Sequence, residues 1–280
     1  MNLIKKQELD NKARVLRRHI LEMVGGEYGK GGHLGGSNSA ADIVTALYFH
    51  KMKINPENPS DNDRDRFLLS KGHAALVQYA ALAELGFFPM DELKKIKTAG
   101  AMLQGHPDRT TTPGVEANTG SLGMGLSIGL GIALGLRLDN NPRKVYVILG
   151  DGELAEGQVW EAALAAAHYK LNNLIAIVDN NKVQAMGPTA KRMDIGALAE
   201  KFTSFGWHTL EIDGHNISEI CEALDTADAI TGKPVMIIAD TIKGKGVSFA
   251  EGQAAFHNPP GLTPEQYETA VGDIKSYVCR

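Results

Sequence analysis

Short apolar runs alternate with stretches of helical periodicity along most of this chain. The runs at 144–149 and 174–178 are continuous, as is typical of parallel strands covered on both faces. Three further segments are predicted to be strands: 66–70, 208–212 and 235–241. Helical apolar spacing occurs at 5–24, 39–50, 74–85, 123–137, 158–169 and 217–229. This alternation predicts an α/β protein with a doubly wound, mostly parallel sheet flanked by helices.

The C-terminal segment, 259–280, predicts a loop followed by a terminal helix. Thr263 is the expected N-cap and Pro264 the first helical residue. The sequence contains no internal repeat, no low-complexity linker and no shift in composition that would mark a domain boundary. We therefore expect residues 1–280 to form one domain.

Composition and charge exclude several classes of protein. The chain has 280 residues, is 43% hydrophobic and carries a formal net charge of −4, without the basic surface of nucleic-acid-binding proteins. The longest apolar stretch, 122–136, contains five glycines and is too short to span a bilayer. Cys221 and Cys279 lie far apart and match no metal-binding spacing. We expect a soluble, cytoplasmic protein that binds neither nucleic acid nor membrane.

The most informative residues follow two consecutive predicted strands. Gly150-Asp151-Gly152 comes directly after one strand, and Asp179-Asn180-Asn181 closes the next. Parallel strands end at the same edge of a sheet, where ligands of doubly wound folds bind. Side-chain oxygens from Asp151 and Asn181, with the Val183 carbonyl, could hold Mg²⁺ or Ca²⁺ against a diphosphate. Either segment alone is more typical of a plain turn, but the two together favour a cation site.

Four histidines lie beside glycine or proline in predicted loops: His33, His73, His106 and His257. Loops at the edge of a sheet often present functional histidines. The other five histidines are interpreted as surface or capping residues: His19, His50, His168, His208 and His215.

The residues at the starts of two predicted helices can be explained either by helix structure alone or by a function in the site. Glu153 and Glu156 follow Gly152 at the start of a helix, where acidic side chains complement the helix dipole. The segment 120–123, Gly-Ser-Leu-Gly, opens another helix. It is either a glycine-rich N-terminus or a source of main-chain groups for a ring or phosphate.

Taken together, these motifs resemble the N-terminal, diphosphate-binding part of the transketolase family. Gly-Asp-Gly followed by Asn-Asn is shared by all thiamine-diphosphate enzymes. The narrower matches are Gly32-His33-Leu34-Gly35, Ser70-Lys71-Gly72-His73, Gly105-His106-Pro107 and Thr119-Gly120-Ser121-Leu122-Gly123. The resemblance implies a thiamine-diphosphate-binding fold and thiamine diphosphate with a divalent metal as cofactors.

The resemblance also implies a role for each matching residue. Asp151, Asn181 and the Val183 carbonyl would hold the metal, and Gly152, Glu153 and His73 would lie along the diphosphate. Gly120 and Leu122 would contact the cofactor's rings or chain, with Asn181 and His257 also near the cofactor. His33, His106 and His257 would meet the sugar, and Glu156 matches an acid of the family's subunit-interface network.

The chain ends soon after His257, whereas full-length transketolases continue into an aminopyrimidine-binding domain. This departure suggests the first subunit of a split transketolase that transfers a two-carbon ketol unit only with a C-terminal partner chain, in an α2β2 assembly. One alternative is a component of another two-chain thiamine-diphosphate enzyme, such as a 2-oxo acid dehydrogenase first component or a deoxyxylulose-phosphate synthase-like protein. Another is a non-catalytic phosphate-binding scaffold. The segments 70–73 and 105–107 favour transketolase over the other two-chain enzymes, and the four loop histidines make a non-catalytic scaffold the weaker interpretation.

Overall fold

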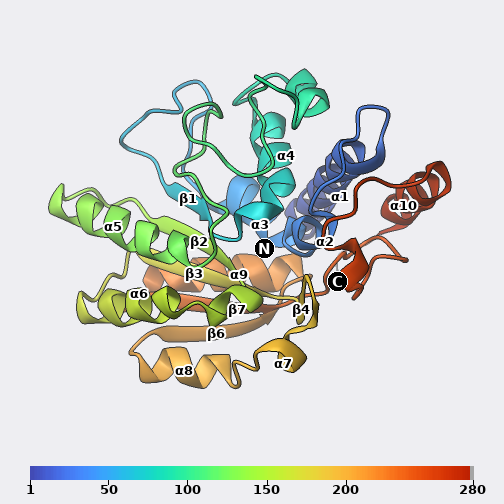
Figure 1. Ribbon diagram of the computed structural model, residues 1–280. Coiled ribbons are helices and arrows are strands. Elements are labelled where there is room, and N and C mark those ends of the chain that lie inside the picture. Colours follow the sequence, from blue (N-terminus) through green and yellow to red (C-terminus); the bar gives the residue numbers. More distant parts are fainter. Residues whose placement is uncertain (278–280) are drawn as a thin grey trace.

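A five-stranded parallel sheet forms the centre of the computed structural model, which describes residues 1–277 (Figure 1). In spatial order its strands are β1 (Arg66–Leu69), β2 (Val145–Gly150), β3 (Leu174–Asn180), β7 (Val235–Asp240) and β6 (His208–Asp213). Every pair of neighbouring strands in this sheet is parallel. The predicted fold class is therefore confirmed, and each predicted strand is present.

Helices cover both faces of the sheet (Figure 1). On one face pack α1 (Leu3–Gly25), α3 (Ala41–Ala46), α4 (Ala75–Leu85) and α9 (Ile217–Ala229). On the other pack α5 (Met124–Leu138), α6 (Gly157–His168) and α8 (Leu198–Ser204). Alternate residues of each strand enter the two cores: Ile148 of β2 belongs to the first, and Val147 to the second. Burial on both faces explains why the central strands read as continuous apolar runs.

The remaining elements are short or lie at the periphery. They are α2 (Leu34–Ser39), η1 (Leu47–Lys51), η2 (Gly72–Ala74), η3 (Met90–Lys95), η4 (Gly152–Ala155), β4 (Val183–Gln184), β5 (Gly187–Pro188), α7 (Thr189–Arg192), η5 (Ala254–Phe256) and α10 (Pro264–Ser276). The predicted start of α10 is confirmed, because the Thr263 side chain and Gln266 form a reciprocal capping box. Among residues 1–277, no helix combines the length and apolar character needed to cross a bilayer.

One predicted helix is wrong in its extent. The segment expected to be a single helix at 39–50 begins at Leu34 and consists of α2, α3 and the π-helical turn η1. Gly35 and Gly36 concealed its first turn, because glycine is a poor helix former whose presence favours a loop prediction. Three short elements, α7, α8 and the β4–β5 hairpin, were not predicted.

The register of the sheet brings the predicted site segments to one edge. Gly150 of β2 pairs with Asp179 of β3, and Asn180 of β3 pairs with Asp240 of β7. The three strands therefore end level with one another. The loops that begin at Asp151, Asn181 and Thr241 leave the sheet side by side.

Candidate functional site

A pocket of about 170 Å³ lies at this carboxyl edge of the sheet. Its lining residues come from six separate segments: Lys71, His73, Leu122, Gly150, Asp151, Gly152, Glu153, Asn181, Val183, Gln184, Ala185, Lys243 and His257. Eight of the twelve predicted site residues are among them. A larger cavity of about 350 Å³ lies between α1, η3 and α10 and contains none of the predicted residues. The chemistry-bearing groups therefore identify the smaller pocket as the candidate site.

Asp151 lies at the floor of this pocket with only 4% of its surface exposed. One carboxylate oxygen accepts from the Lys182 main-chain N–H (2.7 Å) and the Thr189 hydroxyl (2.9 Å). Burial raises the pKa of this carboxyl group. Within residues 1–277 it forms no ion pair: Lys243 interacts with it electrostatically but lies beyond ion-pair distance, so the carboxylate lacks a direct counter-charge. A bound cation would supply that charge.

Asn181 is oriented by a buried neighbour. Its side-chain nitrogen donates to Asp179 (3.1 Å), which leaves the side-chain oxygen facing away from Asp179, where it accepts from the Val183 N–H (3.2 Å). The main-chain carbonyl of Val183 accepts from the Lys243 ammonium (2.9 Å). The three predicted metal ligands thus line one pocket. A metal bound to the Val183 carbonyl would share or displace the Lys243 contact.

The donor set fits a hard divalent cation such as Mg²⁺ better than a transition metal. It offers one carboxylate, one amide oxygen and one carbonyl, and Mg²⁺ takes few protein ligands when phosphate and water supply the rest. Within the described residues, no group of three or more His, Cys, Asp and Glu side chains is placed to hold a metal. Thiol- or imidazole-based sites therefore find no candidate there.

A buried ion pair supports the pocket from below the strand ends. The Lys71 ammonium pairs with Asp179, and both side chains are buried. Ser39 donates to the same carboxylate (2.6 Å), and Lys71 also donates to the Gly36 carbonyl (2.7 Å). Burial opposes ionisation of Asp179, but the charge of Lys71 outweighs it and lowers the pKa of that carboxyl group. Asp179 therefore stays ionised and fixes both Lys71 and Asn181.

Glu153 is the predicted cofactor contact whose carboxylate is already occupied. It accepts from the main-chain N–H groups of Gly123 (2.8 Å) and Gly150 (3.0 Å) and from the Ser70 hydroxyl. Burial raises the pKa of this group, and only 2% of the residue is exposed. The side chain ties three loops of the site together. That Glu153 lies along the diphosphate stays a prediction. Its main-chain N–H is better suited to such a contact than its carboxylate, which already accepts three hydrogen bonds.

The four predicted histidines form a contiguous cluster above the strand ends. The His33 ring lies 5.0 Å from that of His73, 5.1 Å from that of His257 and 6.0 Å from that of His106, measured between ring centroids. His73 and His257 are 5.1 Å apart. Two of the four line the pocket, and the other two extend the cluster outwards from it. The fold thus brings together histidines from both ends of the segment 33–257.

All four imidazoles are held neutral at physiological pH. Burial, followed by nearby positive groups, lowers the pKa of His33 to about 4, that of His73 to about 2 and that of His257 to about 3. Burial and Lys97 also lower the pKa of His106. Nδ1 of His257 is buried and has no hydrogen-bond partner within residues 1–277. Neutral imidazoles can donate and accept hydrogen bonds, and His257 has capacity left for a ligand.

The remaining predicted residues lie around the rim. Leu122 lines the pocket and is 37% exposed. Gly120 packs on His106, because a Cβ atom there would lie 2.7 Å from that ring. Gly152 lines the pocket beside Gln184. Glu156 is exposed at the start of α6 and does not line the pocket, so the structure leaves it available at the surface.

Two lysines of the pocket were not assigned from the sequence. Lys71 and Lys243 are only 1% and 2% exposed, and the Lys243 pKa falls to about 8 because of burial and the nearby Lys71. The signal was present, since both lysines lie in glycine-containing segments at predicted strand ends. The interpretation of His215 as a surface or capping residue is wrong. It is 3% exposed and bonded on both ring nitrogens, because it packs under the loop after β7.

Comparison with known proteins gives the family. The family model described as "Transketolase, thiamine diphosphate binding domain" matches residues 6–269. The 6-deoxy-6-sulfo-D-fructose transketolase subunit of Clostridium sp. (strain MSTE9) is 46% identical over 268 residues, which cover 96% of each chain. One of the subunits of the apulose-4-phosphate transketolase of Phocaeicola vulgatus is 39% identical over 273 residues, covering 97% of this chain and 95% of that one.

The solved transketolase of Leishmania mexicana has the same fold as this chain. The two superpose with a TM-score of 0.87 at 33% sequence identity, over 96% of this chain. This chain covers only 41% of that longer protein, whereas it matches the two bacterial subunits over nearly their full length.

The fold and the pocket thus define a thiamine-diphosphate-binding protein, and the chain belongs to the transketolase family. Within that family it corresponds to the first chain of the two-chain enzymes, so the predicted enzyme class is confirmed. Neither a 2-oxo acid dehydrogenase component nor a deoxyxylulose-phosphate synthase-like protein is supported.

Proposed function

We propose that this chain, as a single diphosphate-binding domain spanning residues 1–280, binds thiamine diphosphate and a divalent metal in the pocket described above. Together with a C-terminal partner subunit it transfers a two-carbon ketol unit from a ketose to an aldose. The observation that carries the proposal is the convergence of Asp151, Asn181 and the Val183 carbonyl on one pocket, where the Asp151 carboxylate is buried without an ion-pair partner among residues 1–277.

Mg²⁺ or Ca²⁺ would be held by those three oxygens, with diphosphate and water completing its shell. The diphosphate would meet Lys243, His73 and the main-chain N–H of Gly152. Lys243 is suited to an anion because it is a buried ammonium group that lines the pocket and, unlike Lys71, forms no ion pair within residues 1–277. Asn181 and the loop from Gly120 to Leu122 would border the rest of the cofactor.

Thiamine diphosphate, when bound, supplies a carbon nucleophile that stores the transferred unit. The chain's own contribution is positioning and proton handling. His33, His106 and His257 are neutral and grouped, so they can orient sugar hydroxyls and exchange protons with them.

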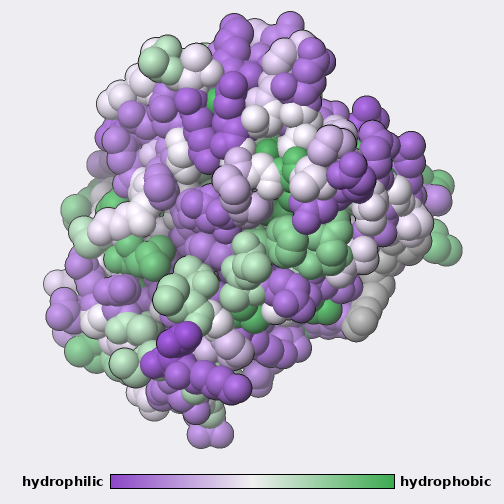
Figure 2. Space-filling model, turned by 45° about the vertical axis from the view of Figure 1, so that its right-hand side comes forward, coloured by the Kyte–Doolittle hydropathy of each residue, from purple (hydrophilic) through white to green (hydrophobic). Residues whose placement is uncertain are grey.

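A partner chain is supported by the surface as well as by the relatives. Figure 2 shows one face of the molecule, on which hydrophobic residues form several patches among hydrophilic ones. Near the pocket, Leu122, Met124 and Met186 are 37%, 39% and 71% exposed. A C-terminal transketolase subunit with the aminopyrimidine-binding domain would cover them, and Glu156 would lie in the interface network. We propose an α2β2 assembly in the cytoplasm.

The two bacterial relatives support a proposal for the substrate class. Their names specify a sugar sulfonate and a sugar phosphate. We propose that the donor here is likewise a ketose with an anionic group at the end remote from the carbonyl. The acceptor is then an aldose, with or without a phosphate.

The test is reconstitution. The chain is mixed with its partner, thiamine diphosphate and Mg²⁺, and transfer from ketose phosphates or sulfonates to aldoses is followed by mass spectrometry, with pyruvate as the donor of the alternative enzyme class. We expect ketol transfer from the mixture and none from the chain alone. Activity of the chain alone, or turnover of pyruvate only, would overturn the proposal.

A further inference from the structure

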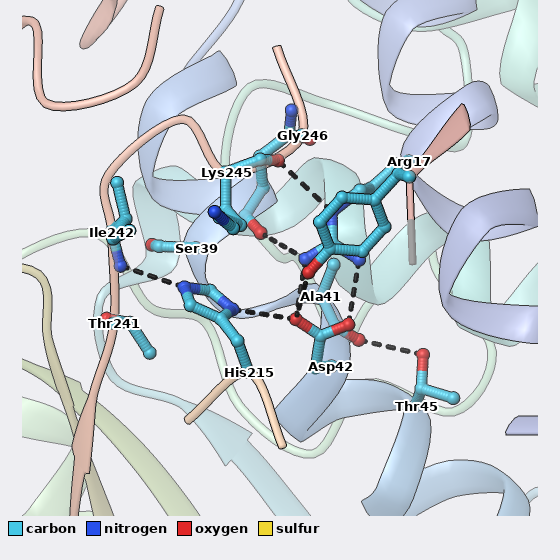
Figure 3. Close-up of polar contacts among 12 residues, drawn as sticks. Arg17, Ser39, Ala41, Asp42, Thr45, His215, Thr241, Ile242, Lys245 and Gly246 are labelled. Carbon is cyan, nitrogen blue, oxygen red and sulfur yellow. Dashed lines mark hydrogen bonds and ion pairs between the residues drawn. The ribbon is translucent and has the colours of Figure 1, made fainter. Parts of the chain in front are cut away.

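A second buried polar cluster lies outside the pocket and takes no part in the chemistry proposed above (Figure 3). It joins Arg17 of α1, Asp42 of α3 and His215 of the loop after β6, whose side chains are 0%, 0% and 4% exposed. The two terminal nitrogens of Arg17 donate to the two oxygens of Asp42, at 2.8 and 2.7 Å. We call these three residues the Arg17–Asp42–His215 cluster.

The hydrogen bonds fix the tautomer of His215. Its Nε2 atom accepts from the main-chain N–H of Ile242 (2.9 Å), and Nδ1 lies 2.8 Å from Asp42. A main-chain N–H can only donate, so Nε2 carries no proton and Nδ1 donates to the carboxylate. The imidazole thereby links a buried charge to the backbone of the loop that follows β7 (Figure 3).

Arg17 holds the same loop three residues further on. Its Nε atom donates to the main-chain carbonyl of Lys245 (3.1 Å). Ile242 and Lys245 flank Lys243 and Gly244, so the cluster anchors the backbone on both sides of the pocket lysine. The N–H of Gly244 donates to the Gly35 carbonyl (2.9 Å), which adds a third anchor.

The path of this loop is demanding. Gly244 and Gly246 adopt φ values of 76° and 89°, in the left-handed region that favours glycine. A Cβ atom on Gly244 would lie 2.5 Å from the Ala250 carbonyl oxygen. Glycine reaches these φ values without strain but loses much backbone freedom when it is ordered, so the contacts from the cluster help to hold the path in which the Lys243 ammonium reaches the Val183 carbonyl (2.9 Å).

A buried ion pair is not by itself a strong source of stability, since an apolar replacement of similar volume often serves as well. Here, however, Arg17 also bonds directly to the backbone of the loop after β7, and Asp42 is linked to it through His215, so the ion pair can hold that loop in place. Burial opposes ionisation of Asp42, but Arg17 outweighs it and holds the pKa of that carboxyl group well below its usual range. The Tyr277 ring covers the guanidinium at 4.4 Å from the ring centroid.

We propose that Arg17, Asp42 and His215 are positioning residues of the cofactor site, which fix the backbone on both sides of Lys243 and so aim its ammonium at the diphosphate. This inference rests on the proposed function, because it takes the pocket to hold thiamine diphosphate. The cluster acts through Lys243 and touches no substrate or cofactor.

The first experiment replaces His215 by Leu, which removes both hydrogen bonds, and by Gln, which keeps one donor and one acceptor. His19→Leu is the control, since both ring nitrogens of this histidine are likewise engaged, by Glu22 and Glu84 at 3.1 and 2.8 Å, but it lies away from the pocket. Exchange of the Ile242 amide hydrogen is measured in the full chain. Thiamine diphosphate affinity, at fixed Mg²⁺, is measured in the complex with the partner subunit.

We expect His215→Leu to speed exchange of the Ile242 amide and to weaken cofactor binding about tenfold, the effect of losing one charge-assisted contact. The KM for the sugar at saturating cofactor should stay unchanged. His215→Gln should recover most of the affinity, and His19→Leu should match the wild type. Unchanged Ile242 exchange or unchanged affinity in His215→Leu would overturn the proposal.

A double-mutant cycle shows whether the cluster acts through Lys243. In a Lys243→Met background, His215→Leu should cause no further loss of cofactor affinity. Additive losses would contradict a positioning role. Failure of the wild-type complex to bind thiamine diphosphate would refute the proposed function instead, and Ile242 exchange would still decide whether His215 holds the loop.

Discussion

At the residue scale, Asp151 is the group on which the site most depends. Its carboxylate is buried, has a raised pKa and lacks an ion-pair partner among residues 1–277, a combination that favours either protonation or a bound cation. The sequence could predict this residue because it lies directly after an apolar strand. The sequence could not show that Thr189, 38 positions later, supports it.

The Asp151→Ala variant should lose metal-dependent cofactor binding. We expect thiamine diphosphate affinity in the presence of Mg²⁺ to fall by more than about 100-fold, since loss of a direct ligand exceeds the effect of an outer-shell change. Isothermal titration of the complex measures it. Asp63→Ala, which removes an exposed carboxylate paired with Arg143, is the control. Equal affinity in Asp151→Ala and the control would refute the assigned site.

The depressed histidine pKa values predict acid sensitivity. The pKa of His73 is about 2 in the folded chain and 6.5 in the unfolded one. Below pH 6.5 the unfolded chain therefore binds more protons, so the free energy of unfolding falls as the pH falls. His33 and His257 act in the same direction. Stability contributed by these neutral imidazoles is present above pH 6.5 and lost below it.

The His73→Gln variant tests whether His73 makes the free energy of unfolding fall as the pH falls. Its free energy of unfolding should depend less steeply on pH between about 5 and 6.5, by up to about 1.4 kcal/mol per pH unit. Urea unfolding at several pH values measures the slope. A variant with the same slope as the wild type would show that His73 is not held neutral in the fold.

At the scale of elements, the glycines of α5 show which features of a helix the sequence pattern can predict and which it cannot. The sequence predicted a helix over 123–137, and Gly129 shows how closely this helix packs on the sheet, since a Cβ atom there would lie 2.6 Å from Val147. Which glycines are needed could not be predicted. That depends on neighbours distant in sequence, as with Ser70, which lies 2.4 Å from a Cβ atom on Gly125.

Two alanine substitutions in α5 should therefore have opposite effects. Gly125→Ala should lower the free energy of unfolding by about 1–3 kcal/mol, because the added methyl group overlaps Ser70. Gly131→Ala should raise it by about 0.5–1 kcal/mol, because nothing lies within 4 Å of the added atom and alanine favours helix. Urea unfolding of the isolated chain compares them. Equal effects would mean that helix propensity alone governs both positions.

The sequence was most informative where a site residue can be found from the residues next to it in the chain. The carboxyl ends of β2 and β3, and the four loop histidines, could be found from apolar runs and adjacent glycines. Lys71 and Lys243 were missed because a lysine beside a glycine is usually a solvent-exposed turn residue. Their burial arises only when Asp179 and the Val183 carbonyl are brought to them by the fold.

At the scale of the whole molecule, the partner chain should protect the rim of the pocket. Met186 and Met193 are 71% and 56% exposed, and Met186 lies in the turn of the β4–β5 hairpin, whose first strand lines the pocket. On addition of the C-terminal subunit, we expect amide exchange to slow in residues 120–124 and 183–193. The control is α10, where exchange should not change. Slower exchange in α10 with none at the rim would place the partner elsewhere.

The central claim is that Asp151 and Asn181 hold one cation against the cofactor's diphosphate. The most direct measurement is an anomalous-scattering map from crystals of the two-chain complex grown with thiamine diphosphate and Mn²⁺ in place of Mg²⁺. The account predicts one peak about 2.0–2.6 Å from an oxygen of each side chain and from the Val183 carbonyl. A peak bound by other residues, or a cofactor bound outside this pocket, would contradict it.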